Sequence, residues 1–262
     1  MKQRIITAIV AAAIFLPIVM YGKFPFFLFV YLLASIGLYE LVKMKGLPIL
    51  SFGSVYSFIL LWAILLPQSA MNLLDNYGYT KADILLISMI LLLSYTVLSK
   101  NRFTIDDAGF LVMSVLYVGF GFYYLYETRQ TGLIYIFFVL FTIWATDSGA
   151  YFVGRAMGKK KLWPEISPNK TIEGSIGGIV CAWIVALLFA VLSSIETTFF
   201  QLFVMSTLIS IFGQIGDLVE SAFKRYYGVK DSGNLLPGHG GILDRLDSLI
   251  FVLPVLHVLN LL

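Results

Sequence analysis

The sequence is poor in the residues that build disulfides and zinc sites. Cys181 is its only cysteine, and His239 and His257 are its only histidines. A disulfide within the chain and a cysteine-based zinc site are therefore excluded. Cys181 and His257 both lie in apolar runs, where we expect a small buried hydrophobe and a hydrogen-bonded helix residue rather than ligands.

Charged residues are also scarce. They make up 13% of the chain, whereas hydrophobic residues make up 59%, and the mean hydropathy is +0.89. This balance excludes an ordinary soluble domain and indicates a membrane protein. The G-x-x-x-x-G-K-[ST] spacing of a P-loop is absent, and no internal repeat, low-complexity tail or soluble domain is evident. We expect no nucleic-acid partner.

Nine apolar runs approach the length of ~20 residues that a bilayer requires of a helix. They lie at about Ile5–Tyr21, Phe24–Leu41, Phe52–Leu66, Ala82–Leu98, Ala108–Leu125, Leu133–Val153, Ile176–Leu192, Phe199–Ile215 and Leu246–Leu262. The first follows a basic start like that of a signal peptide, but no small-residue cleavage site follows it, so it is interpreted as a retained span. The sequence predicts an all-α polytopic membrane protein with about nine transmembrane helices.

Lysine and arginine are distributed unevenly over the gaps between these runs. If the N-terminus is cytoplasmic, 15 of the 18 lie in gaps on the cytoplasmic side, and only Lys23, Lys81 and Arg129 lie on the other. Because cytoplasmic loops carry an excess of Lys and Arg, this pattern predicts a cytoplasmic N-terminus and an extracytoplasmic C-terminus. We expect a multi-pass protein of the cell (inner or plasma) membrane.

Two long polar gaps, Arg155–Gly174 and Gly213–Asp247, lie late in the chain on the predicted cytoplasmic side. The first five runs are apolar with few polar residues, whereas the last four carry acids, glycines and small residues that let helices pack closely. We therefore predict a transmembrane scaffold over residues 1–130, with about five spans. Residues 131–262 are predicted to form a catalytic region of about four spans, with its active site on the cytoplasmic face.

Four acids lie in or at the ends of the late runs, where a charge costs ~2.5–3.5 kcal/mol near the bilayer centre and less at the interface. They are Asp147, Asp217, Asp244 and Asp247. Carboxylates placed together repel one another unless a cation lies between them, and Mg²⁺ prefers oxygen ligands. The alternative interpretation is a set of ion pairs with the nearby Lys224, Arg225 and Arg245.

The polar gaps also carry more cations than orientation alone requires. The later gap holds Lys224, Arg225, Lys230 and Arg245. These residues and Lys170 are interleaved with Pro, Gly, Ser and Asp, which favours phosphate binding. The Lys159–Lys161 triplet is typical of an orientation signal or of a surface for anionic lipids.

Local patterns predict how these residues are presented. Helical spacing from Gln214 places one set of side chains on a single face, and Gly228 can end that helix. The set comprises Gln214, Asp217, Ser221 and Lys224. Pro237–Gly241 is predicted as a loop with bare backbone N–H groups. Ile166–Gly174 is predicted as a tight loop running into the next helix, with Thr171 and Glu173 near the helix start, where free N–H groups favour an anion.

A family resemblance follows from the spacing of these residues. The pattern consists of Ser221-x-x-Lys224-Arg225, Lys230-Asp231 and Pro237-x-His239-Gly240-Gly241-x-x-Asp244-Arg245-x-Asp247. It resembles the signature of the phosphatidate cytidylyltransferases, also called CDP-diacylglycerol synthases. Upstream, Asp147-Ser148-x-Ala150-Tyr151-x-x-Gly154-Arg155 and Ser167-Pro168-x-Lys170-Thr171-x-Glu173-Gly174 are similar to further motifs of that family.

The resemblance implies a nucleotidyltransferase of phospholipid biosynthesis, which makes CDP-diacylglycerol and pyrophosphate from CTP and phosphatidate with Mg²⁺. Metal ligands implied for one ion or two are Asp217, Asp244 and Asp247. The implied catalytic set adds Lys224, Arg225 and Arg245 to these acids. The implied substrate-binding set is Asp147, Lys170, Ser221, Lys230, Asp231, His239, Gly240 and Gly241. The sequence leaves open whether the chain forms a homodimer among the membrane lipids.

Two other functions remain open at this point. A CTP-dependent lipid-alcohol kinase of the polyprenol type would reuse much of this charge pattern, but it needs a base for a hydroxyl, which only His239 or an aspartate offers. A lipid or ion transporter would use intramembrane acids along an ion pathway. The clustering of the charges on one membrane face, with no repeat among the spans, disfavours the transporter.

Overall fold

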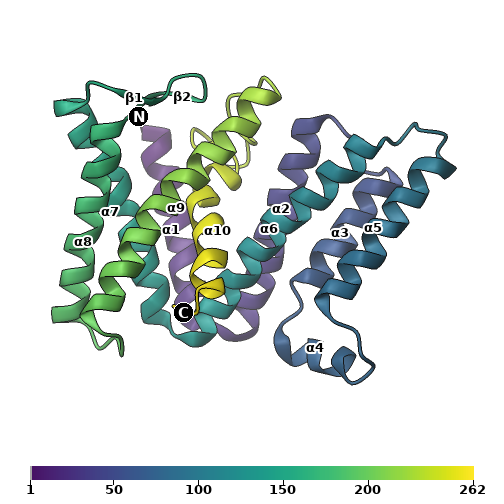
Figure 1. Ribbon diagram of the computed structural model, residues 1–262, viewed down its shortest axis with the longest axis horizontal. Coiled ribbons are helices and arrows are strands. Elements are labelled where there is room, and N and C mark those ends of the chain that lie inside the picture. Colours follow the sequence, from purple (N-terminus) through teal and green to yellow (C-terminus); the bar gives the residue numbers. More distant parts are fainter. Residues whose placement is uncertain (1) are drawn as a thin grey trace. The chain divides into compact units, whose positions relative to one another are not determined.

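The computed structural model describes residues 2–262, and the chain is 76% helical. Helices follow one another along the whole chain, interrupted by a single strand pair (Figure 1). The helices are α1 (Lys2–Tyr21), α2 (Lys23–Lys45), α3 (Phe52–Ile64), α4 (Gln68–Asp75), α5 (Lys81–Leu98), α6 (Ile105–Thr131), α7 (Leu133–Met157), α8 (Ile172–Leu192), α9 (Phe199–Tyr226) and α10 (Leu243–Val258). The strands are β1 (Lys161–Trp163) and β2 (Ser167–Thr171).

The prediction of an all-α membrane protein is confirmed. Within the described chain, six helices are long and apolar enough to cross a membrane: α2, α5, α6, α7, α8 and α9. The other three predicted runs coincide with α1, α3 and α10, which are not among the six. Nine spans and a cytoplasmic N-terminus therefore stay predictions. The short helix α4, between α3 and α5, was not predicted because it is too short to register as an apolar run.

The chain divides into two compact units. The N-terminal unit comprises Ala13–Glu127, and the C-terminal unit comprises the chain up to Ala12 together with Thr128–Leu262. The predicted assignment of scaffold and catalytic roles to residues 1–130 and 131–262 stays a prediction.

Threonine side chains cap the N-termini of several helices. The Thr80 side chain caps α5 and the Thr198 side chain caps α9, each in a reciprocal capping box with the residue three positions on, Asp83 and Gln201 respectively. Each box satisfies two backbone donors that have no partner within the helix. At the other end of α9, the N–H of Gly228 bonds to the Arg225 carbonyl with a φ of 67°, which confirms the predicted helix stop.

Small residues bring α7 and α8 into close contact. A Cβ added at Gly177 would lie 2.5 Å from Val153 of α7, and one added at Gly149 would lie 2.5 Å from the Cys181 sulfur. Both distances are far below van der Waals contact, so neither position accepts a larger side chain without moving a helix. Cys181 is therefore a packing residue of this interface, although it is half-buried rather than buried as predicted.

The segment predicted as a tight loop before α8 is in part a strand. β2 pairs antiparallel with β1 and forms a two-stranded hairpin. A hairpin of this size is marginal alone, and helices anchor it here. The Arg225 guanidinium of α9 donates to the Ile166 carbonyl at 3.2 Å, and β2 runs into α8, whose first turn the Thr171 side chain caps. The predicted position of Thr171 at a helix start is confirmed.

Within the C-terminal unit, the polar segments gather at one end of the helices. The hairpin, the connection between α9 and α10 and the start of the chain lie at that end, and the C-terminus lies at the other (Figure 1). The Thr7 hydroxyl of α1 donates to the Pro237 carbonyl in that connection at 3.0 Å.

Candidate active site

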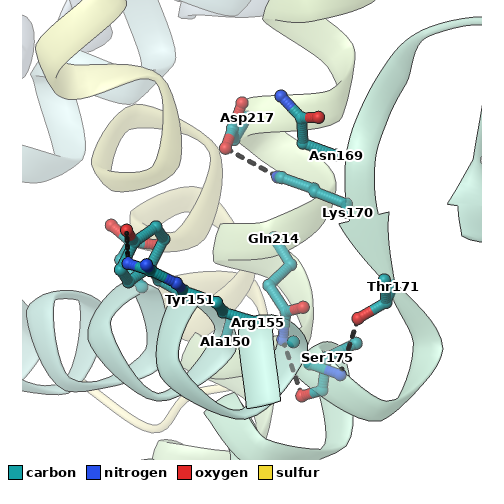
Figure 2. Close-up of a pocket in the computed structure, with 12 residues that line it drawn as sticks. Ala150, Tyr151, Arg155, Asn169, Lys170, Thr171, Ser175, Gln214 and Asp217 are labelled. Carbon is teal, nitrogen blue, oxygen red and sulfur yellow. Dashed lines mark hydrogen bonds and ion pairs between the residues drawn. The ribbon is translucent and has the colours of Figure 1, made fainter. Parts of the chain in front are cut away.

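A polar cavity of about 480 Å³ opens at this end of the C-terminal unit. Three segments of the chain line it: one face of α7, the end of β2 with the first turn of α8, and the middle of α9 (Figure 2). α7 contributes Asp147, Ala150, Tyr151, Gly154 and Arg155, the β2–α8 junction contributes Asn169, Lys170, Thr171, Gly174 and Ser175, and α9 contributes Gln214 and Asp217. Apolar helices thus place ionisable groups beside a space of ligand size.

An ion pair crosses the cavity from the hairpin to α9. Lys170 Nζ lies 2.6 Å from Asp217 Oδ2, and the two side chains are 27% and 36% exposed (Figure 2). The Ser221 hydroxyl, one turn along α9, donates to the other Asp217 oxygen at 3.3 Å. Asp217 and Ser221, two residues of the predicted face of α9, are therefore joined by a hydrogen bond. Gln214 is buried below them and donates to the Ser175 carbonyl at 3.3 Å.

Asp147 projects from α7 toward the same cavity. Its carboxylate has no hydrogen bond or ion pair with the described residues, yet it interacts electrostatically with Asp217 and Lys170. Further along α7, the Arg155 guanidinium donates to the Tyr151 hydroxyl at 3.2 Å, so this exposed cation lies at the cavity wall (Figure 2). Two carboxylates and two cations thus line one cavity.

The charged residues of the cavity, Asp147, Lys170 and Asp217, form a first cluster. A second charged cluster is buried beside it. Lys224 Nζ lies 2.7 Å from Asp244 Oδ1 and also pairs with Glu220, one turn before it on α9. The side chains of Glu220 and Asp244 are 1% and 4% exposed. We call Glu220, Lys224 and Asp244 the buried triad. It contains two carboxylates and one ammonium, and it ties α9 to the first turn of α10.

Asp244 also organises the connection between α9 and α10. Its Oδ2 accepts hydrogen bonds from the Ser232 backbone N–H, the Ser232 hydroxyl and the Gly241 N–H, each at 2.8 Å. Burial raises the pKa of the Asp244 carboxyl, but the hydrogen bonds from Lys224, Gly241 and Ser232 outweigh burial and hold that pKa well below its ordinary value. Gly240 has a φ of 82°, so the predicted loop Pro237–Gly241, which we call the glycine loop, is a tight turn closed by this carboxylate.

Asp247, one turn later on α10, is near residues of both clusters. It is half-buried and interacts electrostatically with Asp217, Asp147 and Lys224. Gly216 permits this placement, because a Cβ there would lie 2.7 Å from the Phe251 Cβ and 2.9 Å from the Asp247 carbonyl. Asp147, Asp217 and Asp247 are thus near enough to repel one another, although they do not form a metal-binding group of three among the described residues.

The remaining predicted residues do not line the cavity. The Arg245 guanidinium donates to the His239 carbonyl at 3.0 Å, and His239 Nδ1 is buried without a hydrogen-bond partner among the described residues. Lys230 and Asp231 are exposed, and Arg225 holds the hairpin through a backbone carbonyl.

The acids fit Mg²⁺ in a particular way. In the described part of the chain, no three His, Cys, Asp or Glu side chains form a ready-made metal site. Mg²⁺ commonly binds through one or two carboxylates and completes its shell with water and substrate phosphates. Asp217 and the unpaired Asp147 supply such a partial set. Asp244 does not, because its oxygens are engaged by Lys224 and the loop; the predicted ligand set of Asp217, Asp244 and Asp247 is thus not assembled as a cluster.

Glu220 is a site residue that sequence reasoning missed. Its signal was present, because Glu followed four residues later by Lys is a favourable helix pair. Its burial and its place beside Asp244 depend on packing between α9 and α10, which local spacing does not reveal.

Comparison with known proteins identifies the class to which this fold and cavity belong. The sequence profile of the Cytidylyltransferase family matches residues 2–262. The chain belongs to this family.

Particular relatives carry a more specific name. The chain is 50% identical over 262 residues to the phosphatidate cytidylyltransferase of Bacillus subtilis (strain 168), an overlap that covers 99% of this chain and 97% of the relative. It is 52% identical over 259 residues to the phosphatidate cytidylyltransferase of Staphylococcus haemolyticus (strain JCSC1435), with 99% and 98% covered. The corresponding protein of Staphylococcus aureus (strain COL) is 49% identical, with the same coverage.

Proposed function

We propose that this chain is a membrane enzyme that makes CDP-diacylglycerol and pyrophosphate from CTP and phosphatidate. The observation that carries the proposal is the polar cavity with Asp147, Lys170 and Asp217, found in a chain whose relatives at about 50% identity are named phosphatidate cytidylyltransferases. Neither the lipid-alcohol kinase nor the transporter is favoured by these relatives.

The reaction needs positioning and charge neutralisation rather than an activated nucleophile. A phosphate oxygen of phosphatidate forms a bond to the α-phosphorus of CTP, and the bond from that phosphorus to the α,β-bridging oxygen breaks. Pyrophosphate leaves with that oxygen and its electron pair. Because the attacking phosphate is already anionic near neutral pH, no general base is required. The protein must hold two anionic substrates together and stabilise the charge that develops on the leaving group.

Cations at the cavity suit this task. Lys170 and Arg155 line it, and Arg245 lies at the glycine loop. In the structure, Lys170 pairs with Asp217. We propose that the Lys170 ammonium binds a substrate phosphate, because it lines the cavity. Arg225, Lys230 and His239 are proposed to support the outer phosphates.

Asp217 and Asp147 are proposed to hold Mg²⁺. Asp247, which interacts electrostatically with both, would add negative charge near the ion without binding it. When bound, the ion supplies neutralisation of phosphate oxygens and orientation of the triphosphate. The buried triad is assigned a different role: Lys224 and Asp244 fix the glycine loop instead of contacting the metal. This assignment follows from the four hydrogen bonds that engage Asp244.

The proposed topology has nine spans, a cytoplasmic N-terminus and the cavity on the cytoplasmic face of the cell membrane. The distribution of Lys and Arg supports it, as does the position of the chain's start at the cavity end of the C-terminal unit and of the C-terminus at the other (Figure 1). A site at this interface lets acyl chains remain in lipid while CTP arrives from the cytoplasm. A homodimer stays open.

The test is synthesis of CDP-diacylglycerol by the purified chain in detergent, with phosphatidate and labelled CTP, with and without Mg²⁺. We expect lipid labelling that requires the ion, and a loss of ~100-fold or more in Asp217→Asn, which keeps the shape and removes the charge. Glu196→Gln is the matched control, because it removes an exposed carboxylate of the same unit away from the cavity. No labelled lipid from the folded chain, or equal turnover by Asp217→Asn and the control, would contradict the proposed site.

A further inference from the structure

A second cavity, of about 430 Å³, lies in the N-terminal unit. It opens where α2 gives way to α3 and where α5 gives way to α6. These two connections lie at the same end of the unit, opposite α4 (Figure 1). Because α2, α5 and α6 are long and apolar enough to cross a membrane, a cavity at their ends matches the depth of phospholipid headgroups. We call it the N-terminal cavity.

The chemistry of the N-terminal cavity favours an anion. Lys100 and Arg102 line it, and neither side chain takes part in an ion pair or hydrogen bond with the described residues. The acid in its wall, Asp107, is neutralised by Lys45, whose Nζ lies 2.9 Å from Asp107 Oδ1. The ends of α3 and α6 that border the cavity, through Ser51 and Asp107, are N-terminal, where the helix dipole is positive.

The other walls of this cavity are apolar. Leu47 and Leu98 line it together with Tyr95 and Phe103, whose rings pack with centroids 5.3 Å apart. Leu98 is 78% exposed at the end of an apolar helix, so the cavity borders an exposed apolar surface. A ligand that matches these walls has an anionic head and an apolar body.

We infer that the N-terminal cavity binds one anionic glycerophospholipid, with its headgroup phosphate on Lys100 and Arg102 and the first part of its chains against Leu98 and Leu47. Charge complementarity and position at the apolar boundary select a lipid over a soluble phosphate. The site is separate from the proposed active site and does not depend on its assignment. Each cation near an anionic surface contributes enough attraction that its loss weakens binding about fivefold, so loss of both weakens it about 30-fold.

The experiment uses the full chain in mixed micelles with equal amounts of phosphatidylglycerol and phosphatidylcholine, and native mass spectrometry counts the retained lipid. We expect one phosphatidylglycerol per chain, and an affinity about 30-fold lower in the double variant Lys100→Gln, Arg102→Gln. The matched control is Lys23→Gln, Lys43→Gln, which removes the same charge from exposed positions of the same unit outside the cavity lining and should keep the lipid.

Three results would overturn the inference. Equal loss of lipid in both double variants would indicate diffuse attraction to the whole cationic surface. Displacement of the lipid by excess inorganic phosphate or by CTP would indicate a soluble anion. Leu47→Trp keeps both cations while filling the cavity, and should also lose the lipid; unchanged retention in this folded variant would exclude the cavity as the site. Size-exclusion profiles check that each variant is folded. If the double variant Lys100→Gln, Arg102→Gln does not fold, Leu47→Trp serves as the test.

Discussion

Replacement of Lys224 by Met removes the one cation of the buried triad. In the structure, Lys224 lies between Glu220 and Asp244, whose side chains are 1% and 4% exposed. Met keeps the length and apolar stem of the side chain, so packing changes little. Two buried carboxylates are then left close together without a cation between them. Asp244 keeps its hydrogen bonds from Ser232 and Gly241, but Glu220 keeps none that the structure shows.

The magnitude follows from the cost of leaving a buried charge unpaired. Removing one partner of a buried ion pair destabilises proteins by about 3–5 kcal/mol, and we expect a loss in this range for Lys224→Met. Glu220→Gln should cost less, about 1 kcal/mol, because it leaves Lys224 and Asp244 as a balanced pair. Lys230→Met, an exposed cation of the same connection, should change stability by no more than about 0.5 kcal/mol.

Two measurements check this ordering. Denaturant titration in detergent micelles, followed by tryptophan fluorescence, gives the free energy of unfolding of each variant. Hydrogen exchange reports on the amides of Ser232 and Gly241, which should exchange faster in Lys224→Met if the triad holds the glycine loop. Equal stability of Lys224→Met and Lys230→Met, with unchanged protection of the loop amides, would refute a structural role for the triad. It would favour direct binding of a substrate phosphate by Lys224.

Three further predictions concern the loop, the topology and the contact between α9 and α10. His239→Gln should retain measurable activity, because an anionic nucleophile needs no general base; complete loss in a folded variant would favour the lipid-alcohol kinase. A reporter fused after Leu262 should be extracytoplasmic and one inserted at 226–236 cytoplasmic, and both on one side would exclude nine spans. Gly216→Ala should destabilise the protein by about 1–3 kcal/mol and lower turnover, because its Cβ would meet Phe251 and the Asp247 carbonyl; unchanged melting and turnover would show that the helices separate without cost.

Local signals in the sequence predicted much of the helical framework. Apolar runs placed nine of the helices, since a bilayer-length apolar stretch has few other structures to adopt. The spacing from Gln214 to Lys224 predicted that α9 continues from its apolar part into the polar interval, and Gly228 predicted its end.

Features that depend on contacts distant in sequence were not predictable in this way. Pro168 and the surrounding polar residues favoured a loop, but the anchor from Arg225 to Ile166 stabilises a hairpin there. The spacing of Asp244 and Asp247 predicted that they share a helix start. It did not show that Asp244 would be engaged by Lys224 and the glycine loop while Asp247 approaches Asp217.

The most direct test of the central claim is the fate of each phosphate of CTP. A cytidylyltransferase attacks the α-phosphorus, so CTP labelled at the α-phosphate should transfer its label to lipid and release unlabelled pyrophosphate. CTP labelled at the γ-phosphate should leave the lipid unlabelled and place all of its label in pyrophosphate. Label from the γ-phosphate in lipid, with CDP as the released nucleotide, would contradict the proposed reaction and identify a kinase.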